Sequence, residues 1–220
     1  MTCVTLTEII VVLDRSGSME SIREATIEAF NGYVQSQMQS EGEVRLSLVQ
    51  FDHEYEEIST NQPISHFQPL SNTTYVPRGS TALYDAVGRT IMQTGQRYAQ
   101  QPEENRPGCV IFVIQTDGFE NASRVYSSKQ IHDMISEQTS RYAWQFVFLG
   151  ANQDAIASAG QVGISPQAAL SYDADKACTK AAFEALAQCT SEYRRGRARS
   201  PHTAGNWQFS SEARANAKRN

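Results

Sequence analysis

The chain has 220 residues, 40% hydrophobic and 20% charged, with a formal net charge of −5 at pH 7. This composition supports a packed core and excludes wholesale disorder, and the length fits one domain with an extension. No apolar run approaches the roughly 20 residues of a membrane-spanning helix, and the N-terminus lacks the basic region and cleavage site of a signal peptide. The four cysteines form no C-x-x-C pair and no zinc-type spacing. We therefore expect reduced thiols in a cytoplasmic protein.

The first predicted strand is the apolar, β-branched run over residues 8–13, and apolar residues at helical spacing follow over residues 19–39. Asp14, Ser16 and Ser18 therefore lie in a loop between the carboxyl end of a strand and a helix, where ligands bind in open α/β sheets. One carboxylate and two hydroxyls suit a hard cation, Mg²⁺ before Ca²⁺, and other loops must complete its coordination. The alternative is a polar turn in which Asp14 or Ser18 caps the helix.

The next stretch predicts a hairpin at the edge of a sheet. Residues 43–52 alternate between apolar and polar side chains, which predicts a strand. Residues 54–60 predict a second, antiparallel strand, and their charged side chains are typical of a sheet edge. We interpret Asp52, between the two strands, as a solvated turn residue. Residues 61–79 contain three prolines and no clear periodicity, which predicts a loop.

The rest of the chain continues the alternation of strands and helices. The predicted elements are a helix over 81–100, strands over 109–115 and 144–149 with a short helix after each, an edge strand over 171–173 and a helix over 174–193. Together these predict an α/β fold, doubly wound and Rossmann-like. Its sheet is six-stranded and mostly parallel, with one antiparallel edge strand and helices on both faces. We expect this domain to cover residues 1–193.

Three stretches of the chain resemble the von Willebrand factor A (vWA) family: D-x-S-x-S after the first strand, a threonine opening the next helix, and T-D-G after the central strand. In that family these positions form a metal-ion-dependent adhesion site. The resemblance assigns the metal ligands to Asp14, Ser16, Ser18, Thr81 and Asp117. It is nearest to small stand-alone vWA proteins of bacteria and their phages. It implies bound Mg²⁺, with Ca²⁺ or Mn²⁺ as alternatives.

The expected site would use its metal to hold a partner. Neutral hydroxyl ligands leave the cation electrophilic, so a carboxylate from a protein partner can replace one of its waters. Helix N-termini at Ser18 and near Thr81 favour that incoming carboxylate. Three further residues have weaker assignments. Arg15 points away from the ligands, toward a partner or solvent; Asp85 holds a metal-bound water or bonds within its own helix; Asn152 borders the same face from another strand end.

Two classes of function compete. The first is a protein-binding module without chemistry of its own, and the second is a Mg²⁺-dependent hydrolase such as a phosphoesterase, because carboxylates at strand ends also serve phosphoryl transfer. Hydrolysis needs a nucleophile or general base beside the metal, and none of the three loops contains a histidine. We therefore predict a binding module rather than an enzyme. The resemblance associates related proteins with ATPases, kinase-containing stress systems, and phage or anti-phage defence.

Residues 194–220 are expected to form a basic C-terminal tail outside the domain. From residue 193 onward the chain has seven Lys or Arg and one Glu, in an otherwise acidic protein. The tail either binds an acidic surface such as nucleic acid, or is a terminal segment that is solvated or folded back onto its own domain. We favour the second interpretation, because Trp207 and Phe209 are its only candidates for stacking on bases.

Overall fold

The computed structural model describes residues 2–152, 154–199 and 207–219. Its strands are β1 (Cys3–Asp14), β2 (Glu43–Phe51), β3 (Tyr55–Pro63), β4 (Pro107–Thr116), β5 (Gln145–Ala151) and β6 (Ala169–Tyr172). Its α-helices are α1 (Arg23–Met38), α2 (Leu83–Gln100), α3 (Ser128–Tyr142), α4 (Ala155–Gln161), α5 (Lys176–Arg199) and α6 (Ser211–Asn216). Short 3₁₀ turns join them, at Gly17–Ile22 (η1), Ile64–His66 (η2), Glu103–Asn105 (η3) and Pro166–Ala168 (η4).

The strands form one six-stranded sheet in the order β3-β2-β1-β4-β5-β6. All neighbouring strands are parallel except β2 and β3, which are antiparallel at the edge. This confirms the predicted fold class. The chain builds β2 and β3 on one side of β1 and then returns to place β4 on its other side. The carboxyl ends of β1 and β4 therefore border the point where the strand order reverses, which is the usual ligand crevice of such sheets.

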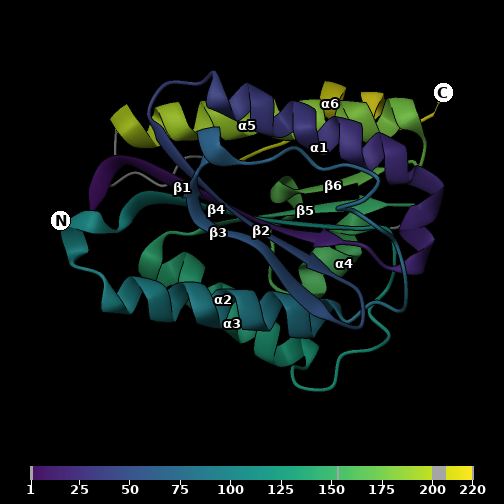
Figure 1. The fold of residues 1–220 in the computed structure, drawn as a ribbon, viewed down its shortest axis with the longest axis horizontal. Helices are drawn as coiled ribbons and strands as arrows, with labels where there is room; N and C mark the ends of the chain where they lie inside the picture. The colour runs from purple at the N-terminus through teal and green to yellow at the C-terminus, as the bar shows by residue number, and fades with distance from the viewer. Residues whose placement is uncertain (1, 153, 200–206, 220) are drawn as a thin grey trace.

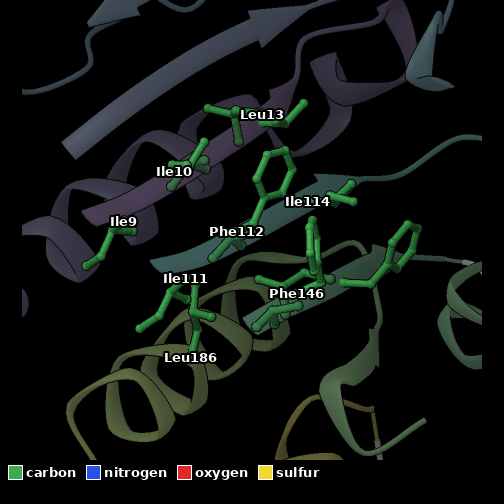
Figure 2. Close-up of a cluster of buried hydrophobic side chains, with 14 of the residues drawn as sticks. Ile9, Ile10, Leu13, Ile111, Phe112, Ile114, Phe146 and Leu186 are labelled. Carbon is green, nitrogen blue, oxygen red and sulfur yellow. The ribbon is translucent and has the colours of Figure 1, made fainter. Parts of the chain in front are cut away.

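Helices cover both faces of the sheet: α1 and α5 lie on one face, with α6 beside α5, and α2 and α3 lie on the other (Figure 1). The central strands are continuous apolar runs because both of their faces are buried. Figure 2 shows side chains of β1, β4 and β5 packed together, with Leu186 of α5 against them. Ile9, Ile111 and Leu186 are fully buried in this cluster. The core thus holds the strand ends that carry the polar loops in fixed positions.

The helix expected from residue 19 begins later than predicted. η1 comes first, where the Met19 backbone N–H donates to the Ser16 carbonyl at 3.0 Å, and α1 starts only at Arg23. The predicted α-helix N-terminus at Ser18 is therefore wrong. The chain keeps the i→i+3 bonds of a 3₁₀ turn up to Arg23, whose backbone N–H donates to the Glu20 carbonyl.

The last long helix, α5, crosses the expected domain boundary at residue 193 and ends at Arg199. Two arginines that look like tail residues in the sequence are buried against the domain. Arg194 donates to the Gln37 side chain at 3.0 Å, and Arg197 donates to the Gly108 carbonyl at 2.8 Å. The end predicted for this helix is therefore six residues too early.

The described part of the C-terminal segment packs on the domain. Trp207 and Phe209 are buried, and the Trp207 ring lies 5.7 Å from that of Tyr193 between centroids. Lys218 and Arg219 form ion pairs with Asp173 and Asp175 respectively. These contacts agree with a segment folded back onto its own acidic domain. Among the described residues, no helix combines the length and apolar character that a membrane crossing requires.

Candidate metal centre

Asp14 ends β1, and its side chain is fully buried. One carboxylate oxygen, Oδ1, accepts the backbone N–H of Ser16 at 2.6 Å, and the other, Oδ2, accepts the hydroxyl of Thr116 at the end of β4. The Asp14 carbonyl accepts the Tyr75 hydroxyl from the long loop after η2. The following loop and the end of β4 therefore orient the carboxylate, and the long loop after η2 holds the Asp14 backbone.

The hydroxyls expected to bind metal surround the same point. The Ser16 and Ser18 Oγ atoms are 3.2 Å apart, and Ser18 Oγ donates to Asp117 Oδ1 at 2.6 Å. Thr81 reaches this group from the start of α2. A Cβ added to Gly118 would lie 3.3 Å from Thr81 Oγ1 and 3.6 Å from Ser18 Oγ. The structure thus brings together the oxygen atoms of three loops that are far apart in the sequence.

Thr81 is held in place by the loop that follows β4. Its backbone N–H donates to Asn121 Oδ1 at 2.9 Å, and its carbonyl accepts the backbone N–H groups of Asn121 and Ala122. In the same loop, Glu120 accepts the Tyr84 N–H at 2.9 Å, in the first turn of α2. Sequence reasoning did not assign these roles to Asn121 and Glu120. The sequence feature that could have indicated these roles is the pair of polar side chains shortly after the buried strand and its T-D-G motif.

Gly79 lets the segment before Thr81 pack against the D-x-S-x-S loop. Its φ is +67°, and a Cβ there would lie 2.1 Å from the His53 ring. In this left-handed conformation its carbonyl accepts the Gly17 N–H at 3.1 Å. Glycine is the residue that adopts such a backbone without strain. The contact joins the D-x-S-x-S loop to the segment that carries Thr81.

Two other carboxylates in the domain are as fully buried as Asp14, and both have arginine partners. Glu8 accepts hydrogen bonds from both terminal nitrogens of Arg97, at 2.9 and 2.6 Å. Asp52 Oδ2 accepts Arg15 Nε at 3.0 Å and Arg78 Nε at 2.9 Å. Burial alone would raise the pKa of Asp52, but these contacts and the Glu54 backbone N–H hold it below its ordinary value.

Asp14 differs, because no Lys, Arg or His of the described residues forms an ion pair with it. Burial and, to a smaller extent, the charge of Asp117 raise its pKa to about 6, although the hydrogen bonds from Thr116 and Ser16 lower it. Burial also raises the pKa of Asp117. A fully buried and a half-buried carboxylate are therefore close together with no Lys, Arg or His ion-pair partner for Asp14 among the described residues, which is an unfavourable arrangement until positive charge is supplied.

These residues fit a divalent cation. Their donors are carboxylate and hydroxyl oxygens, which suit hard cations such as Mg²⁺ and Mn²⁺. No group of three or more His, Cys, Asp or Glu side chains is arranged as a metal site within the described ranges. Any cation at this corner would thus depend on the hydroxyls of Ser16, Ser18 and Thr81 as well as on the two aspartates.

The structure corrects the assignments of Arg15 and Asp52. Arg15 was expected to face a partner or solvent, but it is 6% exposed and pairs with Asp52 and Glu56. Its backbone N–H donates to the Phe51 carbonyl at 2.8 Å, which extends the β1–β2 ladder and directs the side chain toward the β2–β3 turn. Asp52 is accordingly a buried ion-pair residue rather than a solvated one.

The Asp85 carboxylate bonds outside its own helix, not within it. It accepts the backbone N–H groups of Arg124, Val125 and Tyr126 at 2.8–2.9 Å, so it shapes the loop before α3. Asn152 has a φ of +50°, and its Oδ1 accepts the Ala174 N–H at 2.8 Å. It closes the carboxyl end of β5 against β6 and, among the described contacts, makes none to the five predicted ligands.

The family model of the von Willebrand factor type A domain matches residues 8–190. The chain belongs to the vWA family. No curated protein matches this vWA chain in sequence.

Solved structures share the vWA fold at low identity. The mussel byssus protein PTMP1, solved with a zinc-occupied MIDAS motif (metal-ion-dependent adhesion site), is 14% identical, with a TM-score of 0.58. The match covers 84% of this chain but only 48% of the mussel protein.

Two further vWA structures are a manganese-loaded TRAP protein and a pilus domain. The TRAP protein of Plasmodium vivax is 19% identical, with a TM-score of 0.50 over 67% of this chain and 58% of that one. The vWF domain of the type V pili tip protein Mfa5 from Porphyromonas gingivalis is 11% identical, with a TM-score of 0.58. The match covers 86% of this chain and 96% of that one. At these identities the likeness is one of fold.

Proposed function

We propose that this vWA domain is a metal-dependent protein-binding module that captures an acidic side chain of a protein partner through Mg²⁺. The ligands would be Asp14, Ser16, Ser18, Thr81 and Asp117. The observation that carries the proposal is the buried Asp14 carboxylate, which has no ion-pair partner among the described residues although Glu8 and Asp52 do. Mg²⁺ bound there would supply the missing positive charge and a coordination position for a partner's carboxylate.

The hydrogen bonds of the site favour an electrophilic cation. Both oxygens of Asp14 already accept a hydrogen bond, from Ser16 and Thr116, and Asp117 accepts one from Ser18. These bonds disperse part of the carboxylate charge. The neutral hydroxyls of Ser16, Ser18 and Thr81 would therefore supply a larger share of the bonds to the metal. A cation held this way retains affinity for an additional anionic oxygen. The zinc- and manganese-containing vWA structures support a divalent cation in such a corner.

The alternatives considered from the sequence gain no support from the geometry. A phosphoesterase needs a general base, but in the described residues Asp14 and Asp117 are bonded to hydroxyls and backbone N–H groups. Stacking on nucleic-acid bases by the C-terminal segment needs exposed aromatic side chains, and Trp207 and Phe209 are buried. We therefore propose binding without catalysis.

We further propose that the protein acts in the cytoplasm as an adaptor in a bacterial or phage stress or defence assembly. Its partner would be an ATPase, a kinase or a defence-system component. The four free cysteines support a reducing compartment. The choice of assembly rests on the family resemblance rather than on any contact in the site.

The metal half of the proposal is tested by titrating Mg²⁺ and Mn²⁺ into the wild type, Asp14→Asn and Asp133→Asn. Asp133 is an exposed carboxylate on α3 and serves as the matched control. We expect binding and a raised unfolding temperature for the wild type and the control, and neither for Asp14→Asn. Equal binding by all three proteins would contradict the site.

The partner half is tested by capture from a lysate of the source organism, with Mg²⁺ or with EDTA. A partner retained by the wild type and Asp133→Asn only in Mg²⁺, and lost with Asp14→Asn, is the expected result. A partner retained in EDTA and by Asp14→Asn would place the interface elsewhere.

A further inference from the structure

A hollow of about 790 Å³ lies directly beside the candidate metal centre. Its walls come from the β2–β3 turn, the first turns of α2 and the loop of residues 121–126. Ser80 and Ala82, which flank Thr81 in the chain, line it, and so does Asn121, which bonds to Thr81. The hollow and the metal corner therefore share a wall, and one bound molecule can contact both.

Two arginines in the hollow have no acidic partner. Arg89 and Arg124 line it, and both are exposed. Neither forms an ion pair within the described ranges, whereas the nearby Arg15 and Arg78 do. The Arg89 guanidinium lies 4.1 Å from the centroid of the Tyr55 ring, which fixes its position while leaving its N–H groups available.

The acidic side chains of the same hollow are already engaged. Glu54 pairs with Arg78, and the Asp85 carboxylate accepts three backbone N–H groups of the 124–126 loop. The third basic side chain, His53, has its Nδ1 3.2 Å from Asp52 Oδ1. Arg89 and Arg124 are therefore cations of the hollow that no described carboxylate pairs with, in a chain whose formal net charge is −5.

The wall that carries Arg124 is held firmly. Asp85 fixes three consecutive amides of this loop, and the Tyr126 ring covers Gly88 of α2 so closely that a Cβ there would lie 2.7 Å from it. A preformed wall lowers the ordering cost of binding. Val125 in the hollow and Phe119 beside Asp117 are each 70% exposed, so apolar surface borders both the hollow and the metal corner.

We infer that this hollow is a second anion subsite, in which Arg89 and Arg124 bind another acidic group of the same partner segment. The inference rests on the proposed function and specifies the partner: an extended acidic segment with at least two carboxylates and apolar residues near them. One carboxylate completes the metal coordination, and another pairs with the arginines. Arginine suits this role because its planar N–H groups match a carboxylate in bidentate geometry.

The test uses a fluorescein-labelled nonaglutamate peptide, which presents carboxylates at every spacing, and measures its binding by fluorescence polarisation with Mg²⁺ or EDTA. The proteins are the wild type, Arg89→Gln/Arg124→Gln, Asp14→Asn and the control Arg141→Gln/Lys180→Gln. The control removes two exposed cations on α3 and α5, outside the hollow. Circular dichroism checks the fold of each variant, and a Mg²⁺ titration checks its metal affinity.

We expect Mg²⁺-dependent binding by the wild type and about tenfold weaker binding by Arg89→Gln/Arg124→Gln, with its Mg²⁺ affinity unchanged. The control should differ from the wild type by less than about twofold. Equal binding by the hollow variant and the wild type, or an equal loss in the control, would overturn the inference while leaving the proposed function intact. Failure of wild-type Mg²⁺ binding, or peptide binding that is the same in EDTA, would overturn the proposed function and the two-point arrangement with it.

Discussion

Asp14 and Asp52 lie at the carboxyl ends of neighbouring strands, one register position apart, and yet have opposite electrostatic environments. Asp14 ends β1, Asp52 directly follows β2, and both side chains are fully buried. Asp52 has two arginine partners and a lowered pKa, whereas Asp14 has no cation among the described residues and a pKa raised to about 6. The same residue type is thus paired with two arginines at one strand end and, among the described residues, with no cation at the next.

The difference has opposite consequences for stability. The lowered pKa of Asp52 means that its stabilising effect is present above the ordinary aspartate pKa and is lost as the pH falls through its folded value. The raised pKa of Asp14 means that, without metal, stability from this group is present at low pH and is lost as the pH rises toward about 6. A cation at Asp14 would remove this loss, so metal binding and stability would be linked at that corner.

The largest expected effect comes from Asp52→Ala. The change leaves Arg15 buried with only the half-exposed Glu56 as a partner and removes the acceptor of the Glu54 N–H. We expect the free energy of unfolding to fall by about 3 kcal/mol, measured by urea denaturation without metal. Asp133→Ala, at an exposed pair on α3, should change it by less than about 1 kcal/mol. Equal effects of the two changes would show that the Asp52 corner is not structural.

Unlike Asp52→Ala, Asp14→Asn should leave the metal-free protein as stable as the wild type and abolish its stabilisation by Mg²⁺. The amide can still accept the Ser16 N–H and can meet the Thr116 hydroxyl, so we expect no loss of stability without metal. Mg²⁺ at 100 times its dissociation constant should stabilise the wild type by about 2.7 kcal/mol and leave the variant unaffected. Urea denaturation with and without Mg²⁺ measures both quantities. An unfolded Asp14→Asn protein would mean that the carboxylate is structural after all.

A smaller effect is expected from Thr116→Val. Thr116 Oγ1 donates to Asp14 Oδ2 and thereby orients the carboxylate without being one of the predicted ligands. Loss of such an orienting bond typically weakens metal affinity by about 10- to 100-fold. Calorimetric titration of Mg²⁺ measures the change. Thr94→Val, at a buried threonine of α2 outside the metal corner, is the control and should leave the affinity unchanged.

The smallest effect is that of pH on the wild type. Protons compete with the cation for Asp14, whose pKa without metal is about 6. Apparent Mg²⁺ affinity should be constant above this value and fall about tenfold for each pH unit below it. Titrations between about pH 5 and pH 8 test this dependence. Affinity that does not change over the range would show that Asp14 does not need to ionise for the metal to bind.

Much of the fold and of the site could be predicted because the signals are local. Strands buried on both faces are continuous apolar runs. Residues 8–13 and 109–115 can therefore be recognised as strands without knowing which segments pack against them. The D-x-S-x-S loop, the threonine at 81 and T-D-G each follow or precede a recognisable element. Since parallel strands bring their carboxyl ends to one edge, the sequence alone determined that these groups meet there.

Only the tertiary structure decided which charged side chains are buried and what they contact. Arg15 and Asp52 are 37 residues apart, and Asp85 fixes a loop about 40 residues away, so neither pairing has a local signature. Arg194 and Arg197 look like tail residues until α5 packs them against the domain. In the sequence, Asp14 and Asp52 are both an aspartate after an apolar strand. The arrangement of the neighbouring chain gives Asp52 two arginines and gives Asp14 none among the described residues.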